Sequence, residues 1–391
     1  MLLEVCLIVV VLAAALAAGR LTRRHLPELV SWLVVGALLG PSGMALIPRD
    51  EFDHLRPVIQ VATAVLMFLV GERLSLQALR PARWVVVTAL ASYLSAGVVV
   101  YGGARLAGAD ETLSLLLGTL AGGGAPMTVA ALVGGRRSAY RDGLVAFHAC
   151  CDLLAAVVFA TMLPAVVLVD TPGRSFGSAA RSSLQLGLAG AAVGAAAAVS
   201  LSVAARRSTQ GRAVAAFVVG HIAVAVAVCL VLGLSIPLCG LVMGAVTATR
   251  MPRDLTTVAF RSLGRLEFPL YLLFFTLAGA AIRLGTLPRL GLVGVAYVAG
   301  RTGAKAASGA VAARACGFSP GRAAAFGLDS LPQAGVAVAL AAVGSAALPG
   351  RGIATITLGS IIVFETVGAA IVSRNLDRHA EPGLELVRPA A

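Results

Sequence analysis

The sequence predicts an all-α polytopic membrane protein, with about 13 transmembrane helices of roughly 20 apolar residues each. Hydrophobic residues make up 59% of the 391 residues, and charged residues make up only 13%. A soluble domain is about 45–50% apolar and about 25% charged. This composition excludes a water-soluble enzyme, and the apolar stretches leave no room for a soluble regulatory domain.

The predicted helices follow one another from the N-terminus, separated by short breaks that carry Arg, Asp, Gly or Pro. Their approximate ranges are 3–19, 28–47, 57–71, 84–104, 112–134, 143–169, 182–205, 213–232, 235–248, 264–282, 290–313, 323–347 and 352–373. The first range ends in small residues, as a signal peptide does, but it begins with Glu4 in place of a positive region. We therefore interpret it as a retained first span.

Arginine residues are concentrated in the odd-numbered loops and in the C-terminal tail. Positive loops remain on the cytoplasmic side of a membrane. We therefore expect a protein of the cell (inner or plasma) membrane, with the N-terminus outside and the C-terminus in the cytoplasm. The net charge of +13 comes from these loops, without the aromatic interleaving of a nucleic-acid surface, so we expect no nucleic acid as a partner.

Two basic residues lie inside an apolar segment rather than in a loop. Arg301 and Lys305, the single lysine of the chain, stand four residues apart in the eleventh segment and so share one helix face. A cation in the bilayer is costly, which makes both residues candidates for a functional site. The alternative is that both side chains snorkel to the nearby interface.

Three acidic residues, Asp152, Asp329 and Glu365, also lie in apolar segments. Burial disfavours an ionised carboxylate and a nearby cation favours it, so a carboxyl group under both influences can exchange protons. The alternative for each acid is a structural salt bridge or a helix cap. His148 precedes Asp152 by one helical turn, and it is either a proton relay or a packed, neutral histidine.

The fifth and twelfth segments are each interrupted in the middle, by glycines and a proline at 122–126 and by Pro332 and Gly335. Such interruptions, in corresponding positions of two halves, indicate a transport site near the membrane midplane. Segments 4–6 and 11–13 therefore look like two arms of an inverted repeat. Exposed carbonyls and the ends of half-helices would face an ion there.

Five stretches, in this order and spacing, resemble the monovalent cation:proton antiporters, in the Kef-like and sodium/hydrogen exchanger branch of thirteen-helix type. They are HLPELVSWLVVGALLGPSGM, MFLVGERLSLQALR, LEFPLYLLFFTLAGA, GLDSLPQAGVAVAL and ETVGAAIVSRNL. The resemblance covers most of the chain. It implies secondary-active exchange of Na⁺ or K⁺ for H⁺ by alternating access, in a homodimer surrounded by lipid and without any cofactor.

The resemblance also implies one transmembrane domain over residues 1–391. Its core helices would lie at about 84–169 and 290–373, and its scaffold helices, which include the dimer contacts, at about 1–71 and 205–282. The core would move against the scaffold during transport.

The resemblance further implies an ion site at Asp152, where the family carries an Asn-Asp or Asp-Asp pair. Proton and dehydrated monovalent cation would compete for this carboxylate. Cys151 stands in the first position of the pair and cannot supply a second carboxylate, which leaves the stoichiometry open. Thr128, in the first interruption, resembles the family's hydroxyl or backbone ligand.

The same resemblance assigns Lys305 as the charge partner of Asp152 and Arg301 as a structural residue. Glu365, Asp329 and His148 are expected as supporting residues of this site.

Two other classes of function remain open. An organic-solute (anion) transporter can use the same broken-helix fold, although such a site does not need an intramembrane lysine near an aspartate. A channel or signalling subunit is the other class, and the titratable groups and the lack of a regulatory domain argue against it. Na⁺ and K⁺ both stay open, because selectivity depends on cavity geometry.

Overall fold

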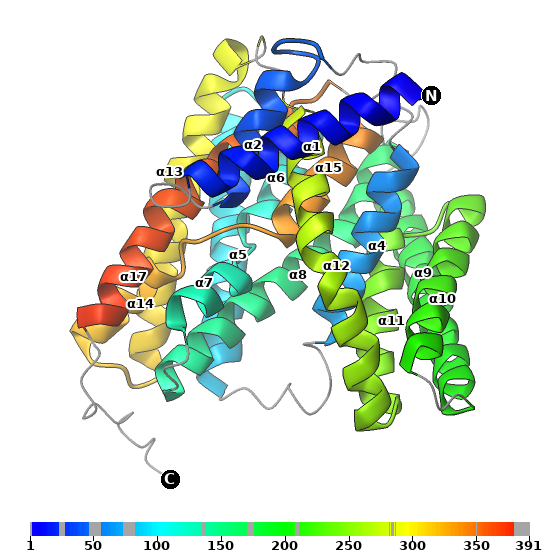
Figure 1. The fold of residues 1–391 in the computed structure, drawn as a ribbon. Coiled ribbons are helices and arrows are strands. Elements are labelled where there is room, and N and C mark those ends of the chain that lie inside the picture. The colour runs from blue at the N-terminus through cyan, green and yellow to red at the C-terminus, as the bar shows by residue number, and fades with distance from the viewer. Residues whose placement is uncertain are drawn as a thin grey trace.

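The computed structural model is helical in every regular element that it describes, which confirms the all-α prediction (Figure 1). Among the described residues, six helical segments are long and apolar enough to cross a membrane. Two of them, Glu111–Val133 and Ile353–Asp377, are composed of shorter helices in sequence. The described residues are 2–22, 28–46, 56–72, 83–134, 138–169, 176–207, 211–280, 282, 285, 287–348 and 350–378.

The helix boundaries follow the apolar segments, and charged turns extend several of them. The tenth segment, for example, was expected from residue 264, but the helix begins at Arg253. A hydropathy pattern detects the part of a helix that lies in the hydrocarbon region and misses turns that project beyond it. The helices are α1 (Leu2–Thr22), α2 (Glu28–Leu39), α4 (Arg56–Glu72), α5 (Arg83–Leu106), α6 (Glu111–Ala121), α7 (Pro126–Val133), α8 (Ala139–Val169), α9 (Phe176–Arg206), α10 (Gly211–Leu232), α11 (Ile236–Arg250), α12 (Arg253–Ala280), α13 (Leu287–Ala315), α14 (Pro320–Asp329), α15 (Val336–Ala347), α16 (Ile353–Val363), the π turn η2 (Phe364–Gly368) and α17 (Ala369–Arg378).

The helices pack in two groups. In the first group, α5, α6, α7 and α8 pack with α13, α14, α15, α16 and α17. In the second group, α4, α9, α10, α11 and α12 pack together, and α1 and α2 lie against α12. Figure 1 shows α13, α14 and α17 on one side of the molecule and α9, α10 and α11 on the other. The groups meet where α15 contacts α4 and α12, and where α8 contacts α9.

Both predicted interruptions are present in the first group. The chain is unwound between Ala121, where α6 ends, and Pro126, where α7 begins. Proline suits this first helical position, because the amide that it lacks would have no partner there. The second unwound stretch, residues 330–335, separates α14 from α15.

The two unwound stretches bond directly to each other. The Ala334 amide donates to the Gly124 carbonyl at 3.0 Å. The Gln333 side-chain amide donates to the Leu120 carbonyl, at the end of α6, at 2.8 Å. The first group therefore contains a crossing of two broken helices whose backbone groups must find partners inside the protein.

The last predicted segment, 352–373, is not one regular helix. Its regular turns give way to the π turn η2, which contains Glu365. A single π turn inside a helix often marks a functional site. The sequence carries no proline at this point, so hydropathy alone did not indicate the irregularity.

Candidate ion-binding site

Asp152 lies on α8 and faces the unwound chain that leads into α7. Its side chain is buried, and its Oδ1 accepts a hydrogen bond from the Gly124 amide at 2.8 Å. The start of a helix presents free amides and the positive end of its dipole, both of which stabilise an anion. The first interruption therefore aims the start of a half-helix at a carboxylate.

His148, one turn earlier on α8, joins the two interruptions. Its Nδ1 accepts from the Ala125 amide at 3.1 Å, and its Nε2 lies 2.9 Å from the Asp329 carbonyl at the end of α14. Because Nδ1 accepts a hydrogen bond, Nε2 carries the proton and donates to that carbonyl. This geometry is that of a neutral ring, as in the packed-histidine interpretation.

Gly124 allows α8 to approach this closely. A Cβ atom at residue 124 would lie 2.6 Å from the His148 carbonyl oxygen and 2.9 Å from its Nδ1. A side chain at this position would push the unwound stretch of chain away from both His148 and Asp152. The run of glycines at 122–124 thus has a steric reason in addition to breaking the helix.

Arg301, on α13, is fully buried and serves both interruptions. Its Nε donates to the Ala121 carbonyl at 2.8 Å and one terminal nitrogen to the Gly123 carbonyl at 2.9 Å. Its other terminal nitrogen donates to Leu331, in the second interruption, at 2.6 Å. The guanidinium also lies 4.1 Å from the centre of the Phe364 ring. A planar donor fork can satisfy several carbonyls at once, as this one does.

Lys305, one turn further along α13, is also fully buried. Its ammonium donates to the carbonyls of Gly122 and Gly123, both at 3.0 Å. These carbonyls lie at the end of α6, where a cation opposes the negative end of the helix dipole. Both basic side chains are buried inside the protein, and Lys305 is close enough to Asp152 for their charges to interact.

A small cavity of about 40 Å³ contains Asp152 and Thr128 on its walls. Its lining comes from α7, α8 and the start of α15 in the first group and from α4 and α12 in the second group. A space of about 10–15 Å³ already holds one water molecule, so a dehydrated monovalent cation fits here. The lining residues are Val70, Ala125, Pro126, Met127, Thr128, Asp152, Tyr271, Ala334, Gly335 and Val336.

Other predicted site residues lie outside this cavity. Cys151 packs in an apolar cluster with Phe147 and Phe326 and is not among the lining residues. The Asp329 carboxylate accepts from the Tyr140 hydroxyl at 2.6 Å and from the Asn375 amide at 2.8 Å. Asp329 therefore links α8, α14 and α17.

Glu365, on the π turn, is connected to the cavity by a hydrogen bond to one of the lining residues. Its Oε2 accepts from the Thr128 hydroxyl at 2.8 Å, and Thr128 in turn lines the cavity. The structure thus brings Asp152, Thr128 and Glu365 together from three helical segments that are distant in the sequence.

Sequence reasoning did not find Gln333, Tyr271 or Val70. Gln333 had a signal, since it is a polar residue beside Pro332 within an apolar segment. Tyr271 and Val70 lie in ordinary apolar helices, and only the packing of α12 and α4 brings them to the cavity. No spacing rule in the sequence predicts that contact.

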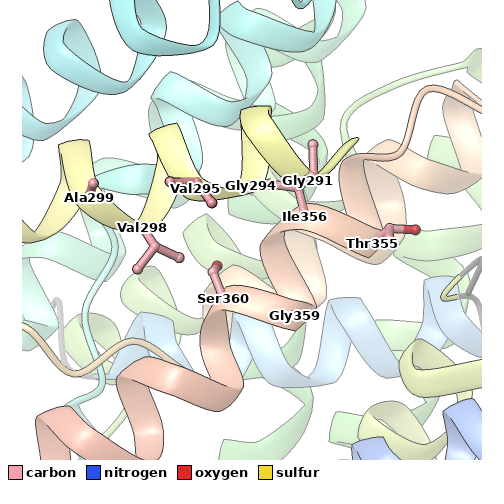
Figure 2. A pocket seen from close by; sticks show the side chains of 9 residues that line it. All are labelled: Gly291, Gly294, Val295, Val298, Ala299, Thr355, Ile356, Gly359 and Ser360. Carbon is pink, nitrogen blue, oxygen red and sulfur yellow. The ribbon is translucent and has the colours of Figure 1, made fainter. Parts of the chain in front are cut away.

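A second hollow, of about 460 Å³, lies between α13 and α16 and is separate from the ion site. Figure 2 shows its nine lining residues, which are small or aliphatic apart from Thr355 and Ser360. None of the nine carries a charge, and neither Asp152 nor Glu365 is among them. This hollow offers no ligand set for an ion.

Comparison with known proteins identifies the fold. The chain matches two structures of the sodium proton antiporter MjNhaP1 from Methanocaldococcus jannaschii, each at 15% identity. The structure at pH 8 has a TM-score of 0.70, with 95% of this chain and 96% of that chain covered. The structure from electron microscopy has a TM-score of 0.74, with coverages of 98% and 100%. These matches show a common fold.

Two sequence comparisons bear on the family. A stretch of 68 residues is 32% identical to the iron transporter MagA of Paramagnetospirillum magneticum, but it covers only 17% of this chain and 15% of that protein. The family model "Sodium/hydrogen exchanger, transmembrane" matches residues 7–374, which is nearly the whole chain. The chain therefore belongs to the sodium/hydrogen exchanger family, whose members are multi-pass membrane transporters that exchange cations for protons.

Proposed function

We propose that this protein exchanges Na⁺ or K⁺ for H⁺, with the proton and the cation competing for Asp152. One observation carries the proposal: Asp152 is buried on α8, where it faces the start of the half-helix α7 and lines the small cavity between the two helix groups. A carboxylate there can be neutralised by a proton or by a cation. It cannot hold both at the same oxygen atoms, so loading one releases the other.

Thr128 and the neighbouring backbone would complete the coordination of the cation. Thr128 lines the same cavity as Asp152, on the first turn of α7. Oxygen ligands suit a hard cation such as Na⁺ or K⁺. Lys305, which donates hydrogen bonds to the carbonyls of Gly122 and Gly123 in the unwound stretch, would offset the charge of Asp152.

Alternating access would follow from the position of the cavity between the helix groups. We assign the first group as the moving core and the second as the scaffold through which two copies form a homodimer. Sliding of the core past α4 and α12 would open the cavity to one side of the membrane and then to the other. The protein would act in the cell membrane with its C-terminus in the cytoplasm.

The cavity volume favours an ion over an organic solute. Pockets for drug-sized molecules have volumes of about 300–1,000 Å³, whereas the space beside Asp152 is about 40 Å³. Membership of the sodium/hydrogen exchanger family favours the same choice.

The test is proton flux in proteoliposomes with an acidic interior. Na⁺, Li⁺, K⁺ or Rb⁺ is added outside, and an internal dye reports the pH. We expect the transported cation to make the interior alkaline, and Asp152→Asn to reduce this response to the background of empty liposomes. Asp142→Asn, an exposed change on the same helix, is the matched control and should behave as wild type. The proposal fails if folded wild type responds to no cation, or if Asp152→Asn retains the response.

A further inference from the structure

Glu365 is a buried acid with an unused oxygen atom next to the proposed ion site. The side chain is fully buried on the π turn. Its Oε2 accepts the Thr128 hydroxyl at 2.8 Å, whereas its Oε1 has no hydrogen-bond partner among the described residues. An ionised carboxylate with a buried, unpaired oxygen is costly. A proton or a cation at Oε1 would relieve that cost.

The π turn holds Glu365 between both interrupted helices. Thr128 belongs to α7, after the first interruption. On the same π turn, a Cβ atom at Gly368 would lie 3.1 Å from the Pro332 nitrogen, so this turn packs against the second interruption. A π turn has i→i+5 hydrogen bonds in place of the regular pattern of the α-helix, and such turns are frequent at functional sites.

The charged groups around Glu365 come from two other helices. Asp152 on α8 and Arg301 on α13 are within electrostatic range of its carboxyl group. Arg301 directs its hydrogen bonds to backbone carbonyls of the two interruptions, such as Gly123 and Leu331. The Arg301 charge therefore acts on Glu365 electrostatically and without a hydrogen bond, and Arg301 does not donate to Oε1 of Glu365.

We propose that Glu365 is a second proton-exchanging carboxyl group of the transport cycle, connected to the Asp152 cavity by the Thr128 hydroxyl. This inference rests on the proposed antiport function. Cys151, beside Asp152, cannot supply a second acid, and Glu365 supplies it from the other end of the chain. Two protons would then leave, one from each carboxyl group, as one monovalent cation enters. One net positive charge would cross the membrane per cycle, so exchange would be electrogenic.

The experiment measures protons exchanged per cation in proteoliposomes, from the membrane potential at which net exchange stops. We expect a ratio of two for wild type and of one for Glu365→Gln, which keeps an oxygen atom for the Thr128 hydroxyl. Exchange by the variant should also lose its dependence on membrane potential. Glu111→Gln, an exposed change at the start of α6, is the matched control and should keep the ratio of two.

A second measurement does not need turnover by the variant. Purified protein in weakly buffered detergent is mixed with the transported cation, and the protons released per cation bound are counted. Wild type should release two protons and Glu365→Gln one, with folding checked by size-exclusion chromatography.

The outcomes separate this inference from the proposed function. A wild type that exchanges cations at a ratio of one, or a Glu365→Gln variant that keeps the wild-type ratio and proton release, overturns the role of Glu365 and leaves antiport standing. A wild type without any cation-dependent proton flux overturns both.

Discussion

The two interrupted helices both carry glycine and proline at the break, but they differ in the groups that bond to their free backbone atoms. At the first interruption, Lys305 binds the carbonyls of Gly122 and Gly123, while Asp152 and His148 accept the amides that follow. Ionisable or titratable side chains thus hold both ends of the break. The free groups of two half-helix ends must find such partners, because water is absent from this depth.

At the second interruption, the partners are the Arg301 guanidinium, backbone amides and the ring of His148, which it shares with the first break. Arg301 binds the carbonyls of Leu331 and Pro332, and the Ala334 amide donates to Gly124 of the other break. The second break therefore depends on the first and supports it. A glycine–proline interruption indicates where backbone amides and carbonyls lack helical partners. Whether an ion can bind there depends on the side chains that bond to those groups.

Replacing Arg301 should have the largest effect on stability, because this side chain donates hydrogen bonds to both breaks. Arg301→Ala leaves several buried carbonyls without donors, and we expect a loss of about 3–5 kcal/mol of stability. Thermal melting of the purified protein in detergent measures this. Lys305→Met, which affects only the first break, should cost less. Equal melting temperatures for the two variants would contradict the assignment of Arg301 to both breaks.

Gly124→Ala should be the next most damaging change, because it separates the first break from α8. The added Cβ would clash with the His148 backbone, at a cost of about 1–3 kcal/mol. Cation-dependent proton flux should fall with it, since Asp152 loses its amide partner. Gly303→Ala, on α13 with open space around it, is the matched control and should melt at or above the wild-type temperature. A transport-competent Gly124→Ala would show that the close approach is not required.

Two variants of His148 distinguish a role as a hydrogen-bonded bridge between the two breaks from a role as a proton relay. Gln offers one acceptor and one donor, so His148→Gln should keep the bridge, the transport activity and its pH profile. His148→Leu leaves the Ala125 amide and the Asp329 carbonyl unpaired and should cost about 2 kcal/mol. Melting curves and flux at several pH values decide between the roles. Loss of transport in a stable His148→Gln protein would favour the relay.

Gln333→Leu should have the smallest effect. It removes neutral hydrogen bonds to the Leu120 carbonyl and to the Tyr297 hydroxyl. The Leu120 carbonyl keeps the Gly123 amide as a donor, so we expect a loss of about 1 kcal/mol. Transport should persist, because Gln333 is not among the residues that line the cavity. Abolished flux in the folded variant would show that transport depends on the side-chain partners of the second break as well as on those of the first.

The sequence singled out individual polar residues, and it did not predict the hydrogen bonds that they make. Asp152 and Thr128 were both expected, and both line the cavity. Lys305 was expected as the charge partner of Asp152, and this role stays a prediction, while its hydrogen bonds go to the carbonyls of Gly122 and Gly123 in the first break. A charge pattern indicates that a buried cation needs partners, and it does not say whether carboxylates or carbonyls provide them.

By itself, the sequence determined that this is an all-helical membrane protein with two broken helices and buried charges. Those features follow from composition and local chemistry, because apolar length, glycine and proline act within a few residues of their position. Only the tertiary structure decided that Glu365 bonds to Thr128, and that α4 and α12 line the cavity. These contacts join residues far apart in the chain, and they depend on how whole helices pack, which no local pattern encodes.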